Sequence, residues 1–194
     1  IDYEGFPLIT REPFTQFVEA LADALHSRDR LLAVTVHART TETAYEAALA
    51  QDWERLAAAA DVFNLMTYDY TSRVEPPGPI APASWKRQVL AYAETVAELG
   101  KVRLGLPFYG YSWMRGNPPA TTVAWDGVMR WVESFGLEIV REPDSQEMQI
   151  ELRARGLPRQ NIFMNDATST AHKLATAAGD FPAGDGGLEI EHGL

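Results

Sequence analysis

Residues 31–37 of the chain, Leu31-Leu32-Ala33-Val34-Thr35-Val36-His37, form a short apolar run rich in β-branched side chains. A run of this kind is typical of a strand buried in a parallel sheet. Two further strands are predicted at residues 62–70 and 102–109. Apolar residues at helical spacing mark the segments before and between the strands, at residues 10–27, 43–60 and 82–100. This alternation predicts an α/β fold, either a doubly wound sheet or a (β/α) barrel.

The part of the chain after residue 113 is less regular. Its predicted elements are a helix at 121–135, short strands at 137–140, 149–152 and 161–164, and a final helix that Asp166 or Thr168 can cap. No internal repeat or linker interrupts the sequence. We therefore expect a single domain over residues 1–194, with an irregular insertion at about 114–160.

Composition restricts the function before any motif is considered. Of the 194 residues, 46% are hydrophobic and 23% charged, which is typical of a globular domain. The net charge of −10 disfavours nucleic acid and anionic membranes as partners, because both would repel the chain. The chain has no cysteine, so it has no disulfide and no thiolate metal site. No apolar run reaches the roughly 20 residues of a membrane helix, and we expect no membrane insertion. A neutral ligand such as a sugar suits this composition.

Both α/β architectures place function at the carboxyl ends of the strands. Three chemically dense stretches are predicted there: Asp2 with Glu4, residues 66–70 and residues 105–113. In an extended strand, Asp2 and Glu4 project from the same face, about 6 to 7 Å apart. Two neighbouring carboxyl groups can take different protonation states, so that one serves as a general acid while the other stays ionised.

Together these motifs resemble those of glycoside hydrolase family 18, the chitinase-like family. The family's fourth strand carries three alternating acids that end in Glu, its sixth strand carries Met-x-Tyr-Asp, and its seventh carries Gly-Leu-Pro-x-Tyr-Gly. The matches in this chain are Asp2 and Glu4, then Met66, Tyr68 and Asp69, then residues 105–110. The first acid of the series is expected just before Ile1. The resemblance implies a (β/α)8 TIM barrel, present here as an incomplete barrel of strands four to eight.

A fourth segment points to one branch of the family. Asn165-Asp166-Ala167 with Ser169 and Lys173 resembles the Asp-Ala-x-Ser-x-x-x-Lys segment of bacterial spore-germination-type members, which act on cell-wall glycans. One departure stands beside this match. The family's final strand carries a Trp that floors the substrate site, whereas residues 187–193 contain no Trp.

The resemblance implies a retaining, substrate-assisted mechanism. Glu4 would protonate the glycosidic oxygen while the substrate's own N-acetyl carbonyl attacks the anomeric carbon, the exception to the usual two-carboxylate scheme. Asp2 would hydrogen-bond the acetamido nitrogen, and Tyr68 would hold the acetamido oxygen. The remaining implied roles are electrostatic support by Asp69, a site floor formed by Met66, and sugar subsites shaped by Tyr109 and Trp113. No metal or cofactor is required.

Alternative interpretations remain open. Tyr68 and Asp69 at a strand end can simply cap the following loop, and His37 is interpreted as a core histidine in preference to a site residue. At the level of function, the chain is either a hydrolase of N-acetylglucosamine polymers, chitin or peptidoglycan, or a weak or inactive glycan-binding domain of the same fold. The presence of Glu4 favours the hydrolase, and the missing Trp favours the binding domain. By resemblance, we expect the full-length protein to be secreted or associated with the cell wall.

Overall fold

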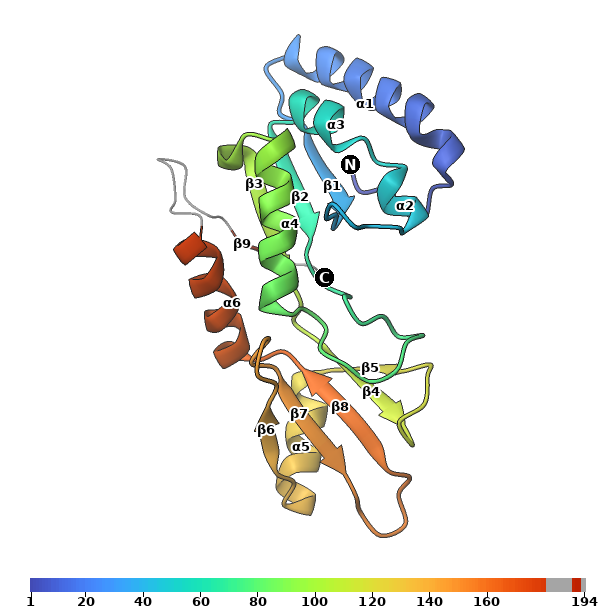
Figure 1. Cartoon of the computed structure of the whole chain (residues 1–194), viewed down its shortest axis with the longest axis vertical. Helices are drawn as coiled ribbons and strands as arrows, with labels where there is room; N and C mark the ends of the chain where they lie inside the picture. The colour runs from blue at the N-terminus through green and yellow to red at the C-terminus, as the bar shows by residue number, and fades with distance from the viewer. Residues whose placement is uncertain (181–189, 193–194) are drawn as a thin grey trace. The chain divides into compact units, whose positions relative to one another are not determined.

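The computed structural model describes residues 1–180 and 190–192, which form two compact units. The first unit, called the parallel unit, comprises Ile1–Thr67, Arg87–Gly105 and residues 190–191. The second, called the antiparallel unit, comprises Tyr68–Lys86 and residues 106–180 and 192. Figure 1 labels the helices and strands of both.

The parallel unit is built on one sheet (Figure 1). Its strands, in spatial order, are β1 (Ala33–His37), β2 (Val62–Met66), β3 (Val102–Leu106) and β9 (Ile190–His192). β2 pairs in parallel with both β1 and β3. The spatial order follows the chain order without the reversal of a doubly wound sheet, as in a barrel, although the described strands close no barrel. Of the predicted final strand, residues 187–189 and 193 lie outside the described part of the chain.

The first residues of the chain extend this sheet beyond β1. Asp2 forms a parallel bridge with Thr35. The backbone N–H of Thr35 donates to the Ile1 carbonyl oxygen at 2.8 Å. The acid pair therefore begins on a short extended segment beside β1, as the sequence predicts.

Alternating side chains of β1 and β2 divide into two sets. The buried, apolar set comprises Val34, Val36, Phe63 and Leu65. The half-buried, more polar set comprises Thr35, His37 and Asn64. The Phe63 ring meets the Trp53 ring edge to face, with centroids 5.4 Å apart. The core of the parallel unit thus lies between the sheet and its helices, and the polar set occupies the other face.

Helices connect the strands of the parallel unit. They are η1 (Leu8–Thr10), α1 (Arg11–His26), α2 (Glu46–Leu49), α3 (Trp53–Ala59), α4 (Ala83–Val96) and η2 (Leu99–Lys101). α1 and α4 confirm two of the predicted helices. Among the described residues, no helix combines the length and the apolar character that crossing a bilayer requires.

The prediction of one helix over residues 43–60 is wrong, because the helical conformation is interrupted between α2 and α3. Asp52 leaves the helical conformation (φ −76°, ψ 88°), and its side chain caps α3 by accepting from the Arg55 N–H. Gln51 is completely buried in the break. Its Oε1 accepts from the His37 N–H at 2.7 Å and its Nε2 donates to the Tyr3 carbonyl at 3.2 Å. The break thereby ties β1 to the segment that carries the acid pair.

The antiparallel unit is a five-stranded sheet with two helices. In spatial order the strands are β5 (Thr121–Val123), β4 (Gly110–Met114), β8 (Gln160–Met164), β7 (Met148–Leu152) and β6 (Ile139–Arg141), and the helices are α5 (Trp125–Phe135) and α6 (Ala167–Asp180). Within the insertion expected at about 114–160, the short strands predicted at 137–140 and 149–152 correspond to β6 and β7. The helix predicted at 121–135 starts only at Trp125, because residues 121–123 pair with β4.

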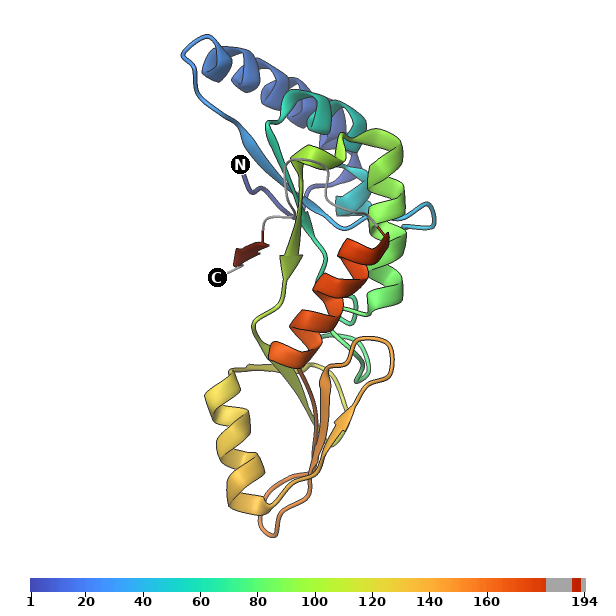
Figure 2. The same ribbon diagram turned by 90° about the vertical axis from the view of Figure 1, so that its left-hand side faces the viewer.

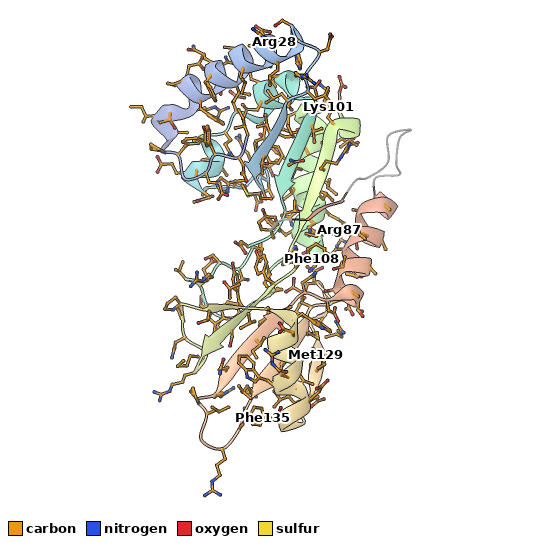
Figure 3. The ribbon with its side chains drawn as sticks, turned by 180° about the vertical axis from the view of Figure 1, so that it is seen from behind. Arg28, Arg87, Lys101, Phe108, Met129 and Phe135 are labelled. Carbon is orange, nitrogen blue, oxygen red and sulfur yellow. The ribbon has the colours of Figure 1, made fainter. Side chains whose placement is uncertain are left out.

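The two faces of this sheet carry different cores. α5 lies against one face (Figure 2), where Val128 packs with apolar residues of β7 and β8. Met129 is part of this packing, whereas Phe135, at the other end of α5, is exposed (Figure 3). The other face carries Tyr111, Trp113 and Phe163. β4 approaches β8 so closely at Gly110 that a Cβ there would lie 2.5 Å from the Phe163 carbonyl oxygen. Only glycine fits at this position.

Candidate active site

The acid pair lies at the edge of the parallel unit, and both side chains are exposed. The bridge to Thr35 fixes the backbone register of Asp2. Continued by two residues, this register aligns Glu4 with His37, the last residue of β1. Because alternate residues share a face, Asp2 and Glu4 belong to the same side of the sheet as the polar set that includes Thr35 and His37.

His37 lies close enough to the acid pair to sense its charge. Burial lowers the pKa of the His37 imidazole below its ordinary value, while the negative charges of Glu4 and Asp2 act in the opposite direction. The ring meets Tyr45 edge to face at 5.2 Å. Its Nε2 is buried and finds no hydrogen-bond partner among the described residues. The interpretation of His37 as a core histidine is therefore corrected: it is half-buried and neighbours the acid pair.

In the antiparallel unit, the side chain of Asp69 forms hydrogen bonds with two tyrosines. Its Oδ1 accepts hydrogen bonds from the hydroxyls of Tyr109 and Tyr111, the latter at 2.7 Å. The Tyr68 ring meets the Tyr109 ring edge to face, with centroids 6.5 Å apart. Asp69 itself has a left-handed backbone (φ +57°), which turns the chain away from the direction of β2.

The structure thus brings together three predicted site residues, Tyr68, Asp69 and Tyr109, and adds Tyr111. The sequence contains a signal for Tyr111, because residues two apart in an extended segment share a face and Tyr109 is already a candidate. We call Asp69, Tyr109 and Tyr111 the Asp69 cluster.

Both tyrosine hydroxyls of the Asp69 cluster stay protonated at neutral pH. Burial raises the pKa of Tyr109 far above its ordinary value, and the hydrogen bond to Asp69 and its charge add to this effect. The same causes raise the pKa of Tyr111 to about 12. The two phenols are therefore permanent donors that hold the Asp69 carboxylate in place.

We expect the substitution Asp69→Asn to lower the pKa of both phenols, because it removes the negative charge beside them. In an ultraviolet titration of the wild-type chain, Tyr109 and Tyr111 should ionise only well above pH 10, and in the variant they should ionise at a lower pH. Since their folded-state pKa values are raised, these phenols stabilise the fold below pH 10, and for Tyr111 this contribution is lost between pH 10 and about 12. Asp126→Asn, at an exposed ion pair, is the control. Identical titrations of wild type and Asp69→Asn would contradict the geometry.

An open cavity adjoins the Asp69 cluster within the antiparallel unit. Its volume is about 480 Å³, and its lining residues are Asp69, Ser72, Arg73, Val74, Tyr111 and Pro119. Arg73 is fixed there through Ala120: its Nε donates to the Ala120 carbonyl at 3.0 Å, and its own carbonyl accepts from the Ala120 N–H at 2.7 Å. The cavity offers a carboxylate, a guanidinium and hydroxyl groups, which suits a ligand rich in hydroxyls.

Met66 and Trp113 are the remaining residues predicted to contact the substrate. Met66 ends β2 opposite His37, and its side chain is largely buried. Trp113 is completely buried among Tyr111, Phe163 and Ile80, and its Nε1 donates to the Glu75 carbonyl at 2.7 Å. A sugar platform needs an exposed ring face, so the expectation that Trp113 shapes a subsite is corrected: it is a core residue.

Comparison with known proteins gives the chain its family. The model of the glycosyl hydrolases family 18 matches residues 1–175. A putative sporulation-specific glycosylase of Bacillus subtilis, YdhD, is 27% identical over 124 residues, which are 64% of this chain and 29% of that protein. The chain therefore spans less than a third of this curated relative.

Solved structures agree in fold. The crystal structure of a chitinase from Chromobacterium violaceum has a TM-score of 0.87 and 25% identity, over 98% of this chain and 59% of that one. The spore cortex-lytic enzyme SleL of Bacillus cereus has a TM-score of 0.85 and 22% identity, over 98% of this chain and 44% of that one. The family match covers most of the 194 residues. The chain belongs to glycosyl hydrolase family 18, with the TIM-barrel type of α/β fold found in its structural neighbours.

Proposed function

We propose that the chain is part of a retaining glycoside hydrolase that cleaves β-linked N-acetylglucosamine glycans with the help of the substrate's acetamido group. The observation that carries the proposal is the acid pair. Glu4 stands at the position of the family's general acid, two residues after Asp2, and both are exposed beside β1. The family match over residues 1–175 and the similarity to a chitinase support glycan hydrolysis as the chemistry.

The proposed reaction has two steps. Glu4 gives its proton to the glycosidic oxygen, the bond from this oxygen to the anomeric carbon breaks, and the acetamido carbonyl oxygen bonds to that carbon. The products of this step are the departing sugar and an oxazolinium ion. Glu4, now a carboxylate, then takes a proton from a water molecule that attacks the same carbon. The bond from this carbon to the acetamido oxygen breaks, which opens the oxazolinium ring. Two inversions at one carbon leave its configuration retained.

Other residues support the charge that develops. Asp2 accepts a hydrogen bond from the acetamido nitrogen, which carries positive charge in the oxazolinium ion. Tyr68 holds the acetamido oxygen before it attacks. Asp69 binds a sugar hydroxyl, and its fixed hydrogen bonds from Tyr109 and Tyr111 suit a preorganised site. Met66 lines the floor of the site, and Tyr109 contributes to a sugar subsite.

We propose further that residues 1–194 are part of a single catalytic domain. The segment at Asp2 and the strands β1, β2, β3 and β9 would then be strands four to eight of the barrel. We propose a substrate class as well. Relatives named as a sporulation-specific glycosylase and a cortex-lytic enzyme, together with the segment from Asp166 to Lys173, favour a cell-wall glycan over chitin. A secreted or wall-associated location suits such a substrate.

A glycan-binding domain with weak or no activity is the second candidate. Two observations favour it: Trp113 is buried, and the sequence of residues 187–193 contains no Trp. Calorimetry with an N-acetylchitooligosaccharide, next to a turnover assay, separates the two candidates. Binding without product formation by the full-length protein would favour this second candidate.

The substitution Tyr68→Phe tests the proposed reaction. We expect kcat on a fluorogenic N-acetylchitooligosaccharide to fall about 10²-fold in the full-length protein, because one hydrogen bond to the reacting acetamido group is lost. The matched control is Tyr92→Phe, since Tyr92 serves through its ring, which packs on Trp53 and lies under Arg39. Unchanged kcat in Tyr68→Phe would show that this hydroxyl takes no part in the reaction.

A further inference from the structure

A buried ion pair inside the antiparallel unit has no role in the proposed reaction. The side chains of Glu147 and Lys173 are completely buried. The Lys173 Nζ donates to Glu147 Oε1 at 2.7 Å and to Asn165 Oδ1 at 2.6 Å. Moving two charges out of water is costly, and only excellent geometry with further hydrogen bonds offsets the cost. The groups that form these further hydrogen bonds therefore indicate the structural role of the ion pair.

Glu147 holds the loop that follows Asp69. Its Oε2 accepts from the Ile80 N–H at 2.8 Å and its Oε1 accepts from the Ala81 N–H at 2.9 Å. The carbonyl of Ile80 in turn accepts from the Tyr70 N–H at 2.8 Å. Tyr70 directly follows Asp69, so the carboxylate of Glu147 is linked through one peptide group to the backbone that orients Asp69.

Asn165 holds the connector that carries Tyr109. This connector lies between β3 and β4 and includes Phe108 (Figure 3). The Nδ2 of Asn165 donates to the Pro107 carbonyl at 2.6 Å, and its backbone N–H donates to the Tyr109 carbonyl at 3.3 Å. Its Oδ1 accepts a hydrogen bond from Lys173 Nζ. Lys173 therefore connects Glu147, which binds the loop after Asp69, to Asn165, which binds the connector before Tyr109.

The start of α6 places Lys173 for this purpose. Ser169 and Asp166 cap the helix reciprocally, since each backbone N–H donates to the other's side-chain oxygen, at 2.9 and 2.8 Å. Arg141 grips Asp166 with two parallel hydrogen bonds of 2.8 and 2.7 Å. Lys173 follows Ser169 by four residues, one turn further on the same face. The Asp-Ala-x-Ser-x-x-x-Lys segment is thus a cap followed by a buried ammonium group.

We propose that Glu147, Lys173 and Asn165 are positioning residues of the active site. They bridge the loop after Asp69 and the connector before Tyr109, and so bring the hydroxyl of Tyr109 onto the Asp69 carboxylate. The value of this bridge for hydrolysis rests on the proposed function of Asp69. Its effect on the two loops does not, and is measured separately.

The test uses the double substitution Glu147→Gln/Lys173→Met, which keeps the side-chain sizes and removes both charges. Burial and the charge of Lys173 lower the pKa of the buried Lys86, and the charge of Glu147 acts in the opposite direction. Glu147→Gln alone is therefore unsuitable, because it would remove this negative charge from beside two buried lysines. We measure hydrogen–deuterium exchange in the chain. Exchange at Tyr70, Ile80 and Ala81 should rise about tenfold or more as their carboxylate-anchored hydrogen bonds weaken, with α5 unaffected.

A second variant and a control make the assignment specific. Asn165→Asp removes the donor to the Pro107 carbonyl and adds a charge that Lys173 compensates; we expect faster exchange at the amides of residues 108–111, with Ile80 still protected. Glu151→Gln makes the same chemical change on β7, at a carboxylate that pairs with Arg153 and Arg159 nearer the surface. It should leave exchange in both loops unchanged.

The activity of the full-length protein supplies the second readout. Both positioning variants should lower kcat about tenfold and change KM less than threefold, because misplacing Asp69 and Tyr109 acts on the transition state more than on binding. A uniform rise of exchange throughout the antiparallel unit, with kcat per folded molecule unchanged, would overturn the proposal. If the wild type does not hydrolyse glycans, the proposed function fails while the exchange measurements still decide whether the bridge positions the loops.

Discussion

Replacing Glu4 with glutamine is expected to lower kcat of the full-length protein by about 10²- to 10⁴-fold, the usual contribution of a general acid. Glutamine keeps the size of the side chain and its hydrogen-bonding oxygen, but it has no proton to transfer. The loss should depend on the leaving group. A substrate with an acidic phenol as leaving group needs little protonation, so the variant should retain far more activity on it than on an oligosaccharide.

The control for this substitution is Glu12→Gln, which makes the same change at an exposed carboxylate paired with Arg55 in the parallel unit. We expect it to hydrolyse both substrates at the wild-type rate, because surface ion pairs contribute little. Steady-state rates on the two substrates are the measurement. Equal rates for wild type and Glu4→Gln on the oligosaccharide would mean that another group donates the proton.

Replacing Lys173 with methionine is expected to destabilise the antiparallel unit by about 3 to 5 kcal/mol, because the buried Glu147 carboxylate loses the ammonium group that lies 2.7 Å from its Oε1. Methionine fills nearly the same volume, so the loss reports on the charge. Urea unfolding monitored by tryptophan fluorescence measures it, since Trp113, Trp125 and Trp131 all belong to this unit.

Two comparisons separate this effect from a general loss of a lysine. Lys101→Met changes a half-buried lysine at the end of η2 (Figure 3) and should alter stability by no more than about 0.5 kcal/mol. Adding Glu147→Gln to Lys173→Met should recover part of the lost stability, because the buried carboxylate that has lost its contact with Lys173 no longer carries a charge. If Lys173→Met unfolds at the wild-type urea concentration, the buried pair is not a support of this unit.

Strands with a clear pattern could be predicted from the sequence, and their ends could not. The apolar run at residues 31–37 became β1, Ala33–His37. The strand predicted at residues 62–70 ends at Met66, because the N–H of Thr67 donates to the Leu65 carbonyl of its own segment at 2.8 Å, and Asp69 further on takes a left-handed backbone. The helix predicted over residues 43–60 fails for a related reason: apolar periodicity continues through Gln51 and Asp52, while the side chains of these two residues bind the backbone and stop the helix.

The candidate site was predictable where motif residues share a strand end or a short connector. Of the motif residues, Tyr109 contacts both Asp69 and Tyr68. Trp113 was misassigned because strand alternation places it on the face of Tyr109 and Tyr111 but does not show that this face is covered there; the burial of its ring depends on Phe163 in β8, about fifty residues away. The pairing of Glu147 with Lys173 depends on how α6 packs, which no local pattern specifies.

The central claim is that Glu4 and the substrate's acetamido group act together to give hydrolysis with retention. Proton NMR of an N-acetylchitooligosaccharide, recorded during the first minutes of hydrolysis by the full-length protein, measures the configuration of the newly formed reducing end. The β-anomer should appear first and convert slowly to the α-anomer. Initial formation of the α-anomer would mean direct attack by water and would contradict the mechanism.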